Sequence, residues 1–313
     1  MPLTVVQLRG GLPETFHPVS AALSDGARTL WSVGPDDRCF WRSGCKPLQL
    51  ATSLEHLPSD AVAALADADL AVGASSHSGQ PAHVARVRDL LARFGLAEEG
   101  LRCGAHAPMH EPSARDVPTP GPVHNNCSGK HTFMLAAARA QGWDDDYLPA
   151  DHPLQVRNRA RIRAWSEVDP GVAVDGCGVP TFHVPVSGMA RAFGRLAVAM
   201  ADRDGHPGRV GWAMQKHPEM VSGHGRLDLA VSTRAAEPLA CKVGAEGLFD
   251  IAIPGRRLGL VVKVWTGNAD ALAVAVKAVL AEVAPGVLAG EWPWETVTNV
   301  VGRVVGERRA TWS

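Results

Sequence analysis

Several features that would indicate nucleic acid, a membrane or a dinucleotide are missing from this sequence. The formal net charge is −1 and no long run of Lys or Arg is present, which argues against a nucleic-acid or anionic-membrane partner. The first residues lack the long apolar segment of a signal peptide, and no stretch approaches a transmembrane span. A Gly-x-Gly-x-x-Gly motif after a strand is not evident either. The sequence therefore favours a protein that binds neither nucleic acid nor a membrane.

The cysteines also lack the pairing of common zinc modules, because no Cys-x-x-Cys occurs. The six cysteines are scattered along the chain, at positions 39, 45, 103, 127, 177 and 241. Without a signal sequence, this distribution predicts a cytoplasmic location, where cysteines are buried thiols, metal ligands or reactive groups.

The length and composition are those of a globular protein with a large core. The 313 residues are 46% hydrophobic and 20% charged. One large domain and two fused lobes are both compatible with this length. Because no internal repeat or low-complexity linker is found, we expect a single domain over residues 1–313.

Apolar periodicity and turn residues predict strands near both ends of the chain and helices between them. The expected strands are 4–9, 16–23, 28–33, 239–247 (running into a glycine turn), 248–253 and 258–266. The expected helices are 47–57, 61–72 (running into a short strand), 81–95, 132–141, 153–167, 187–203, 207–216, 225–236 and, capped by Asn268, a terminal helix 269–283. Irregular structure is expected at 103–125, and a loop at 175–182. This order predicts an α+β fold with one mostly antiparallel sheet flanked by helices.

The first candidate catalytic motif is Ser43-Gly-Cys-Lys46, at the start of a predicted helix. Positions i and i+3 share a helix face, so the Ser43 hydroxyl and the Lys46 amine can meet. A neutral lysine can take the proton of a serine and make it a nucleophile. Taken alone, the same motif is also compatible with an ordinary polar helix start.

Two further motifs follow in order, Ser76-His-Ser78 in a loop and Lys242-Val-Gly244 on a strand. The set parallels the Ser-x-x-Lys, Ser-Asp-Asn and Lys-Thr-Gly motifs of serine β-lactamases and penicillin-binding proteins. A second serine can relay a proton to the leaving nitrogen, and a strand lysine supplies positive charge. The set therefore predicts a Ser-Lys amidohydrolase, although a serine replaces the lactamase Asn and Val243 replaces the Thr. Ser75 is an alternative to Ser76, which we prefer for its Ser-x-Ser spacing.

The middle of the chain departs from lactamases with His124-Asn-Asn-Cys-Ser-Gly-Lys-His131 and Asp175-Gly-Cys-Gly178. Two thiolates, from Cys127 and Cys177, would suit zinc. From the residues alone, the third ligand could be His131, Asp175 or a neutral Lys130. Composition alone slightly favours the alternative interpretation, two buried cysteines beside tight turns.

Together, these motifs resemble the class 3 (rhizobial-type) L-asparaginases of the asparaginase II family. The resemblance rests on Arg-Ser-x-x-Lys-Pro, His-Asn-Asn-Cys-Ser-Gly-Lys-His, Asp-Gly-Cys-Gly-Val-Pro and Lys-x-Gly-Ala-Glu-Gly, and extends from Arg9 to the last predicted helix. It implies a fold similar to serine β-lactamases and glutaminases, a homodimer, and hydrolysis of L-asparagine to L-aspartate and ammonia.

The resemblance also implies roles for individual residues. The expected catalytic residues form two Ser-Lys pairs, Ser43 with Lys46 and Ser76 with Lys242. The expected zinc ligands are Cys127, Lys130 and Cys177. The expected substrate-binding residues are Asp175, for the α-amino group, with Arg42 and His131 lining the pocket. A lysine ligand requires Lys130 to be neutral, which an adjacent cation would enforce.

Two alternative functions are compatible with the same motifs. One is a β-lactamase or D,D-peptidase relative, against which the missing export signal counts. The other is a zinc-stabilised binding protein with an inactive site. The sequence does not determine the preference for asparagine over glutamine, since one methylene is discriminated by pocket dimensions.

Overall fold

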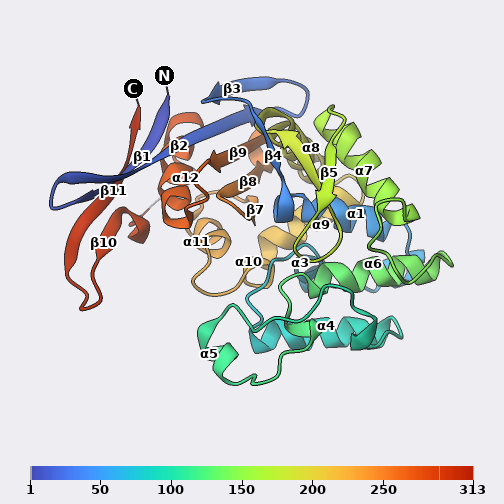
Figure 1. Cartoon of the computed structure of the whole chain (residues 1–313). Helices are drawn as coiled ribbons and strands as arrows, with labels where there is room; N and C mark the ends of the chain where they lie inside the picture. The colour runs from blue at the N-terminus through green and yellow to red at the C-terminus, as the bar shows by residue number, and fades with distance from the viewer. Residues whose placement is uncertain (1, 289, 313) are drawn as a thin grey trace.

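The computed structural model describes residues 2–288 and 290–312. Its main sheet has the strand order β10-β11-β1-β2-β9-β8-β7, with β3 paired to β2. Both ends of the chain contribute to this sheet: β1 (Leu3–Arg9), β2 (Leu12–Ser24) and β3 (Thr29–Val33), then β7 (Ala240–Gly244), β8 (Leu248–Ile253), β9 (Leu258–Val264), β10 (Thr296–Thr298) and β11 (Val304–Trp312). The pairings are antiparallel. Figure 1 shows the two termini side by side on β1 and β11. The predicted α+β fold is confirmed.

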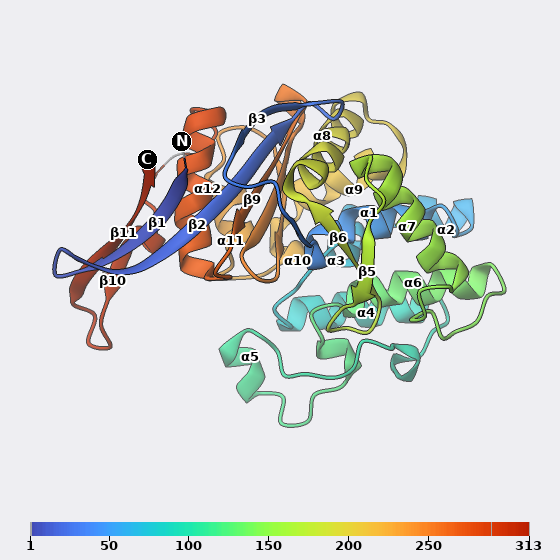
Figure 2. The same ribbon diagram turned by 45° about the horizontal axis from the view of Figure 1, so that its top comes forward.

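Helices cover both faces of the central strands, which explains why these strands are almost continuously apolar. Every residue of β8 is buried. One face packs on α12 (Ala269–Val283), and the other packs on α8 (Val186–Asp202) (Figure 2). Asn268 caps α12 as predicted, its side chain accepting from the Ala271 N–H at 2.8 Å.

Most of the remaining helices lie beyond α8, on the right and bottom of Figure 1. They are α1 (Lys46–Leu54), α2 (Ser59–Ala63), α3 (Asp67–Gly73), α4 (Pro81–Arg93), α5 (Glu111–Arg115), α6 (Ser128–Ala140), α7 (Pro153–Ser166), α9 (Gly205–Lys216) and α10 (Pro218–Val221). Helix α11 (Leu227–Arg234) lies instead beside β7, on the side of α12. The longer helices confirm the predicted ones to within a few residues. Within residues 2–288 and 290–312, no helix is both long and apolar enough to cross a membrane.

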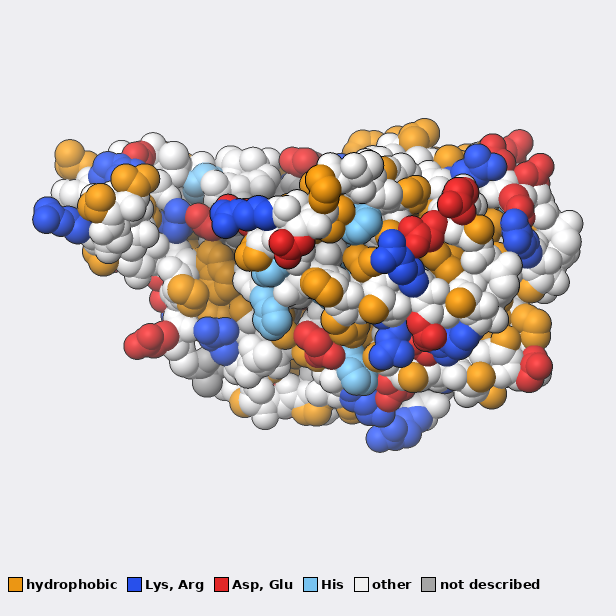
Figure 3. All heavy atoms as spheres, turned by 90° about the horizontal axis from the view of Figure 1, so that it is seen from below, with side chains coloured by type: hydrophobic (Ala, Val, Ile, Leu, Met, Phe, Trp, Pro, Cys, Tyr) orange, Lys and Arg blue, Asp and Glu red, His pale blue; other side chains and the backbone are white. Residues whose placement is uncertain are grey.

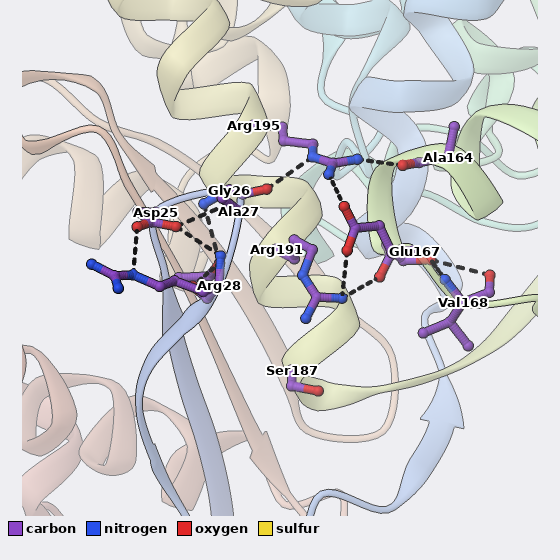
Figure 4. Close-up of polar contacts among 12 residues, drawn as sticks. Asp25, Gly26, Ala27, Arg28, Ala164, Glu167, Val168, Ser187, Arg191 and Arg195 are labelled. Atoms are coloured by element: carbon purple, nitrogen blue, oxygen red, sulfur yellow. Dashed lines mark hydrogen bonds and ion pairs between the residues drawn. The ribbon is translucent and has the colours of Figure 1, made fainter.

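Arginines of α8 attach this helix to the surrounding elements (Figure 4). Arg195 donates to the Gly26 carbonyl at 2.9 Å and pairs with Glu167. Arg191 donates to the Ser166 carbonyl at 2.8 Å. The helix that supports one face of the sheet is thereby connected both to the β2–β3 turn and to the end of α7.

Three predicted elements were wrong. The chain does not end on the 269–283 helix, because β10 and β11 follow it; β11 carries Glu307, Arg308 and Arg309 and so lacks the apolar pattern of a buried strand. The strand expected at the end of 61–72 is absent, since this segment forms α2 and α3. The expected loop 175–182 is irregular only at its start, because β6 (Pro180–Pro185) pairs with β4 (Arg38–Phe40) and β5 (Gly171–Val174) in a second sheet.

Candidate active site

Ser43 lies on a 3-10 turn, η1 (Arg42–Cys45), that immediately precedes α1, and not on the α-helix itself as expected. Arg42 has φ +50°, a left-handed conformation that is uncommon for a residue with a side chain. This conformation is held in place by the second sheet, since the Arg42 N–H donates to Thr181 Oγ1 at 3.1 Å. Ser43 remains partly exposed, while Lys46 is fully buried. The turn therefore presents a reachable hydroxyl above a buried amine.

The Lys46 amine is bound to the loop that follows α3. Its Nζ donates to Ser76 Oγ at 2.9 Å and to the Ser75 carbonyl at 2.6 Å. The Ser75 hydroxyl instead donates to the Val72 carbonyl at 2.6 Å, at the end of α3. Of the two adjacent serines, the geometry thus favours Ser76 as the one that belongs to the site.

Lys242 lies on the edge strand β7 and is fully buried. Its Nζ donates to the Val243 carbonyl at 2.8 Å and lies 3.9 Å from Asp228 Oδ1. Burial lowers the pKa of Lys242 to about 8; the Asp228 carboxylate opposes this shift, and the neighbouring Lys46 adds to it. A lysine with this pKa can exchange a proton near neutral pH.

The hydrogen bonds of the four expected catalytic residues differ from the two Ser-Lys pairs that the sequence predicts. In the described part of the chain, no hydrogen bond between side chains joins Ser43 to Lys46 or Ser76 to Lys242. Lys46 contacts Ser76 instead, and Lys242 lies near enough to Lys46 for their charges to interact. Lys46, Ser76 and Lys242 thus form one cluster, and Ser43 lies three residues before Lys46 on the adjoining turn.

The two residues expected to contact the substrate at its polar end form an ion pair. Arg42 Nε donates to Asp175 Oδ1, which also accepts the Gly176 N–H at 2.8 Å. The turn between β5 and β6 holds Asp175, whose N–H donates to the Val179 carbonyl at 2.8 Å. Arg42 directly precedes Ser43, so the ion pair lies next to the candidate nucleophile.

The expected metal ligands also come together. Lys130 Nζ lies 3.2 Å from Cys177 Sγ, and the Cys127 thiol donates to Asn126 Oδ1 at 3.1 Å. The neighbouring Cys127 and the charge of Lys130 lower the pKa of Cys177, although burial opposes the shift. Burial disfavours the charged form of Lys130, but the influence of Cys177, and after it Cys127, outweighs burial and raises the pKa of Lys130.

The donor set fits a zinc ion chemically, since two thiols and an amine meet in a buried site. The buried His131 Nε2, which faces Cys177, has no hydrogen-bond partner in the described structure. Its other ring nitrogen is bound to the Tyr147 hydroxyl at 2.9 Å. No three His, Cys, Asp or Glu side chains of residues 2–288 and 290–312 form a metal-binding group. A site of Cys127, Lys130 and Cys177 is of a different kind, because its third donor is a lysine amine.

Comparison with known proteins adds the family. The model of the L-asparaginase II family matches residues 5–310. The chain belongs to the L-asparaginase II family. Its members are amidohydrolases, so the enzyme class expected from the motifs is confirmed. No curated protein matches the chain in sequence.

One solved structure similar to this asparaginase-family chain is described as the crystal structure of a β-lactamase (Mb2281c) from Mycobacterium bovis. The two chains are 15% identical, with 84% of this chain and 94% of the other covered, and the TM-score is 0.38.

Sequence reasoning missed two buried acids in this asparaginase-family protein. Asp228, in the first turn of α11, lies beside Lys242 and accepts the Val243 N–H at 2.7 Å. Asp250, in the middle of β8, accepts the Trp41 indole N–H at 2.9 Å. Asp250 had a signal, because it is a single acid inside the apolar run Leu-Phe-Asp-Ile-Ala-Ile. Asp228 had none, because an acid near a helix start is common.

Surface charge is mixed on the face shown in Figure 3. Lys and Arg side chains alternate there with Asp and Glu, and several histidines lie along the middle of this face. The six cysteines are all buried free thiols.

Proposed function

We propose that this chain hydrolyses L-asparagine to L-aspartate and ammonia, with Ser43 as the nucleophile. The observation that carries the proposal is the buried Lys46 amine, one turn after Ser43, hydrogen-bonded to Ser76 Oγ and the Ser75 carbonyl. A neutral lysine amine has two N–H donors and one lone pair. With both donors engaged, the lone pair is available to accept the Ser43 proton.

The substrate's polar end would bind at the Arg42–Asp175 pair. Asp175 uses only Oδ1 for its contacts in the described structure, and Oδ2 is free to accept the α-ammonium group of asparagine. Arg42 contributes only its Nε to the ion pair, so its remaining N–H groups can bind the α-carboxylate. Substrate binding therefore requires no separation of the two side chains.

The chemical step begins when Lys46 takes the Ser43 proton and Ser43 Oγ attacks the side-chain amide carbon. The C–N bond then breaks, and the leaving nitrogen receives a proton through Ser76 from the protonated Lys242. The result is ammonia and a β-aspartyl ester on Ser43. Water then attacks this ester and gives a proton through Ser76 to the now neutral Lys242. Lys46 returns its proton to Ser43, and aspartate leaves. In the formation of the ester, Lys46 thus acts in its neutral form and Lys242 in its protonated form.

We also propose that Cys127, Lys130 and Cys177 hold a zinc ion, which when bound would supply positive charge beside the substrate pocket. His131 lies next to Lys130 in sequence and contacts the Cys177 sulfur, so it would line the pocket and help to orient that thiolate. The family membership supports a homodimer as a further proposal, to be measured by light scattering in solution.

The test is ammonia release by the purified protein from L-asparagine and L-glutamine, with and without added zinc or chelator. Release that favours asparagine and responds to zinc supports both the reaction and the metal proposal. Hydrolysis of the lactam nitrocefin without amide turnover would favour a lactamase-like activity. A folded, zinc-loaded protein that releases no ammonia from either amide would contradict the proposed function.

A further inference from the structure

Asp250 is a buried acid that the proposed mechanism does not use, yet it lies directly beneath the turn that carries Ser43. It is fully buried on β8, and its antiparallel partner on β7 is Lys242. Oδ1 accepts the Trp41 indole N–H at 2.9 Å, whereas Oδ2 has no hydrogen-bond partner in the described structure. Burying a carboxyl group with one unpaired oxygen costs folding free energy, so its presence beside the turn that carries Ser43 requires a compensating role.

Gly44 shows how closely the turn is packed on this acid. A Cβ atom added at Gly44 would lie 2.6 Å from Trp41 Nε1 and 2.5 Å from Trp41 Cδ1, and still nearer to Asp250 Oδ2. The backbone between Ser43 and Lys46 therefore rests directly on the hydrogen-bonded Trp41–Asp250 pair. Glycine is required here by space, since any side chain would displace one of these groups.

Trp41 is held from its other side as well. The backbone N–H of Trp41 donates to the Phe182 carbonyl at 2.8 Å. The indole ring packs against Phe193 of α8, with the ring centroids 6.2 Å apart. The ends of the turn are closed by bonds from the Gly44 N–H to the Trp41 carbonyl and from the Lys46 N–H to the Ser43 carbonyl. The indole ring thus fills the space beneath the turn, and its orientation determines the position of the backbone that carries Ser43.

We propose that Asp250 is a positioning residue: by binding the Trp41 indole beneath Gly44, its carboxyl group fixes the turn that places Ser43 against Lys46. The inference rests on the proposed function, because it assigns the consequence of this geometry to the attack by Ser43. Burial raises the pKa of the Asp250 carboxyl well above its usual range, with the Trp41 hydrogen bond opposing the shift. A neutral acid can accept the indole N–H through its carbonyl oxygen, and an asparagine can do the same.

The test compares four variants for turnover, stability and backbone hydrogen exchange. Trp41→Phe removes the donor, Asp250→Leu removes the acceptor, and Asp250→Asn keeps a neutral acceptor of the same shape. The matched control is Phe249→Leu, a substitution at the neighbouring buried residue of β8 that faces α12, away from the turn.

We expect Trp41→Phe and Asp250→Leu to lower kcat by about 10²-fold, the cost of a misplaced reacting group, with KM changed by less than about twofold. Exchange at the Gly44 and Lys46 N–H groups should be faster in both. Asp250→Asn should keep kcat within about threefold of the native value, and Phe249→Leu should lower only the stability.

Native kcat in folded Trp41→Phe would overturn the proposal, as would an Asp250→Asn variant whose turn exchanges as fast as that of Asp250→Leu. Should Asp250→Leu fail to fold, Trp41→Phe and Asp250→Asn still decide the matter. A native protein without amide turnover would count against the proposed function alone; the exchange at Gly44 and Lys46 would then decide whether Asp250 fixes the turn.

Discussion

Lys46 Nζ and Ser76 Oγ are hydrogen-bonded at 2.9 Å across 30 residues of sequence. The bond joins the start of α1 to the loop after α3, so Ser76 binds the lysine that the proposed mechanism assigns to Ser43 as its base. Lys242 interacts with the same lysine through its charge, from β7. Proton transfer between the attacking and the leaving group can therefore pass through one small, buried cluster.

The shared lysine leads to a prediction for the two adjacent serines. Ser76→Ala removes the hydroxyl that Lys46 contacts, and we expect kcat to fall by about 10² to 10⁴-fold, the range for loss of a general acid or base. Ser75→Ala is the matched control, because its hydroxyl is bound to the Val72 carbonyl and not to Lys46. It should cost about 1 kcal/mol of stability and little kcat. If Ser75→Ala lowered ammonia release more than Ser76→Ala, the relay would be assigned to Ser75.

The pKa of Lys242 predicts the alkaline side of the pH profile. If protonated Lys242 supplies the proton to the leaving nitrogen, kcat should fall as the pH rises through about 8. Asp228→Asn removes the carboxylate that raises this pKa, so the fall should move to lower pH. Rates measured from pH 6 to 10 in both proteins test this, and an unmoved alkaline limb in Asp228→Asn would contradict it.

Lys242 also predicts a pH dependence of stability. Its folded-state pKa of about 8 lies below the unfolded value of 10.5. Between these two values the unfolded chain binds more protons, so the free energy of unfolding should rise with pH, by about 3 kcal/mol from this group. Below pH 8 the contribution is constant. Urea unfolding at pH 7.5 and 10, compared with Lys242→Met, measures it; an equal pH dependence in the variant would exclude Lys242 as its source.

Zinc binding is testable without any activity measurement. The native protein should carry about one zinc per chain, and a chelator should lower its Tm, because a metal bound only to the folded state stabilises it. Cys127→Ser and Cys177→Ser should each abolish the bound zinc. Cys39→Ser is the control, since Cys39 lies on β4 outside the ligand set. Zinc content that survives both ligand variants would place the metal elsewhere.

Elements with strong local signals could be predicted from the sequence. The α12 helix has a clear N-cap at Asn268, and β8 and β9 are short apolar runs joined by a turn. Strand β11 could not be predicted in this way, because its partner β1 is some 300 residues away and its exposed side gives it a polar composition. Register across such a distance is decided by tertiary contacts.

The site residues likewise divide into those that a local motif indicates and those that depend on tertiary packing. Motifs identified Ser43, Lys46, Cys127 and Cys177, and the structure joins Lys46 to Ser76 and Cys177 to Lys130. Spacing predicted that Ser43 and Lys46 share a face of one α-helix, whereas Ser43 lies on a 3-10 turn before the helix. Asp228 and the Trp41–Asp250 contact depend on how distant elements pack, so no local pattern indicates them.

The most direct test of the account is ammonia release from L-asparagine by Ser43→Ala beside the native protein. Removal of the nucleophile should lower kcat by at least about 10³-fold. The variant should keep the native circular dichroism and Tm, because Ser43 is partly exposed. Native turnover in a folded Ser43→Ala protein would contradict the assignment of Ser43 and, with it, the proposed mechanism.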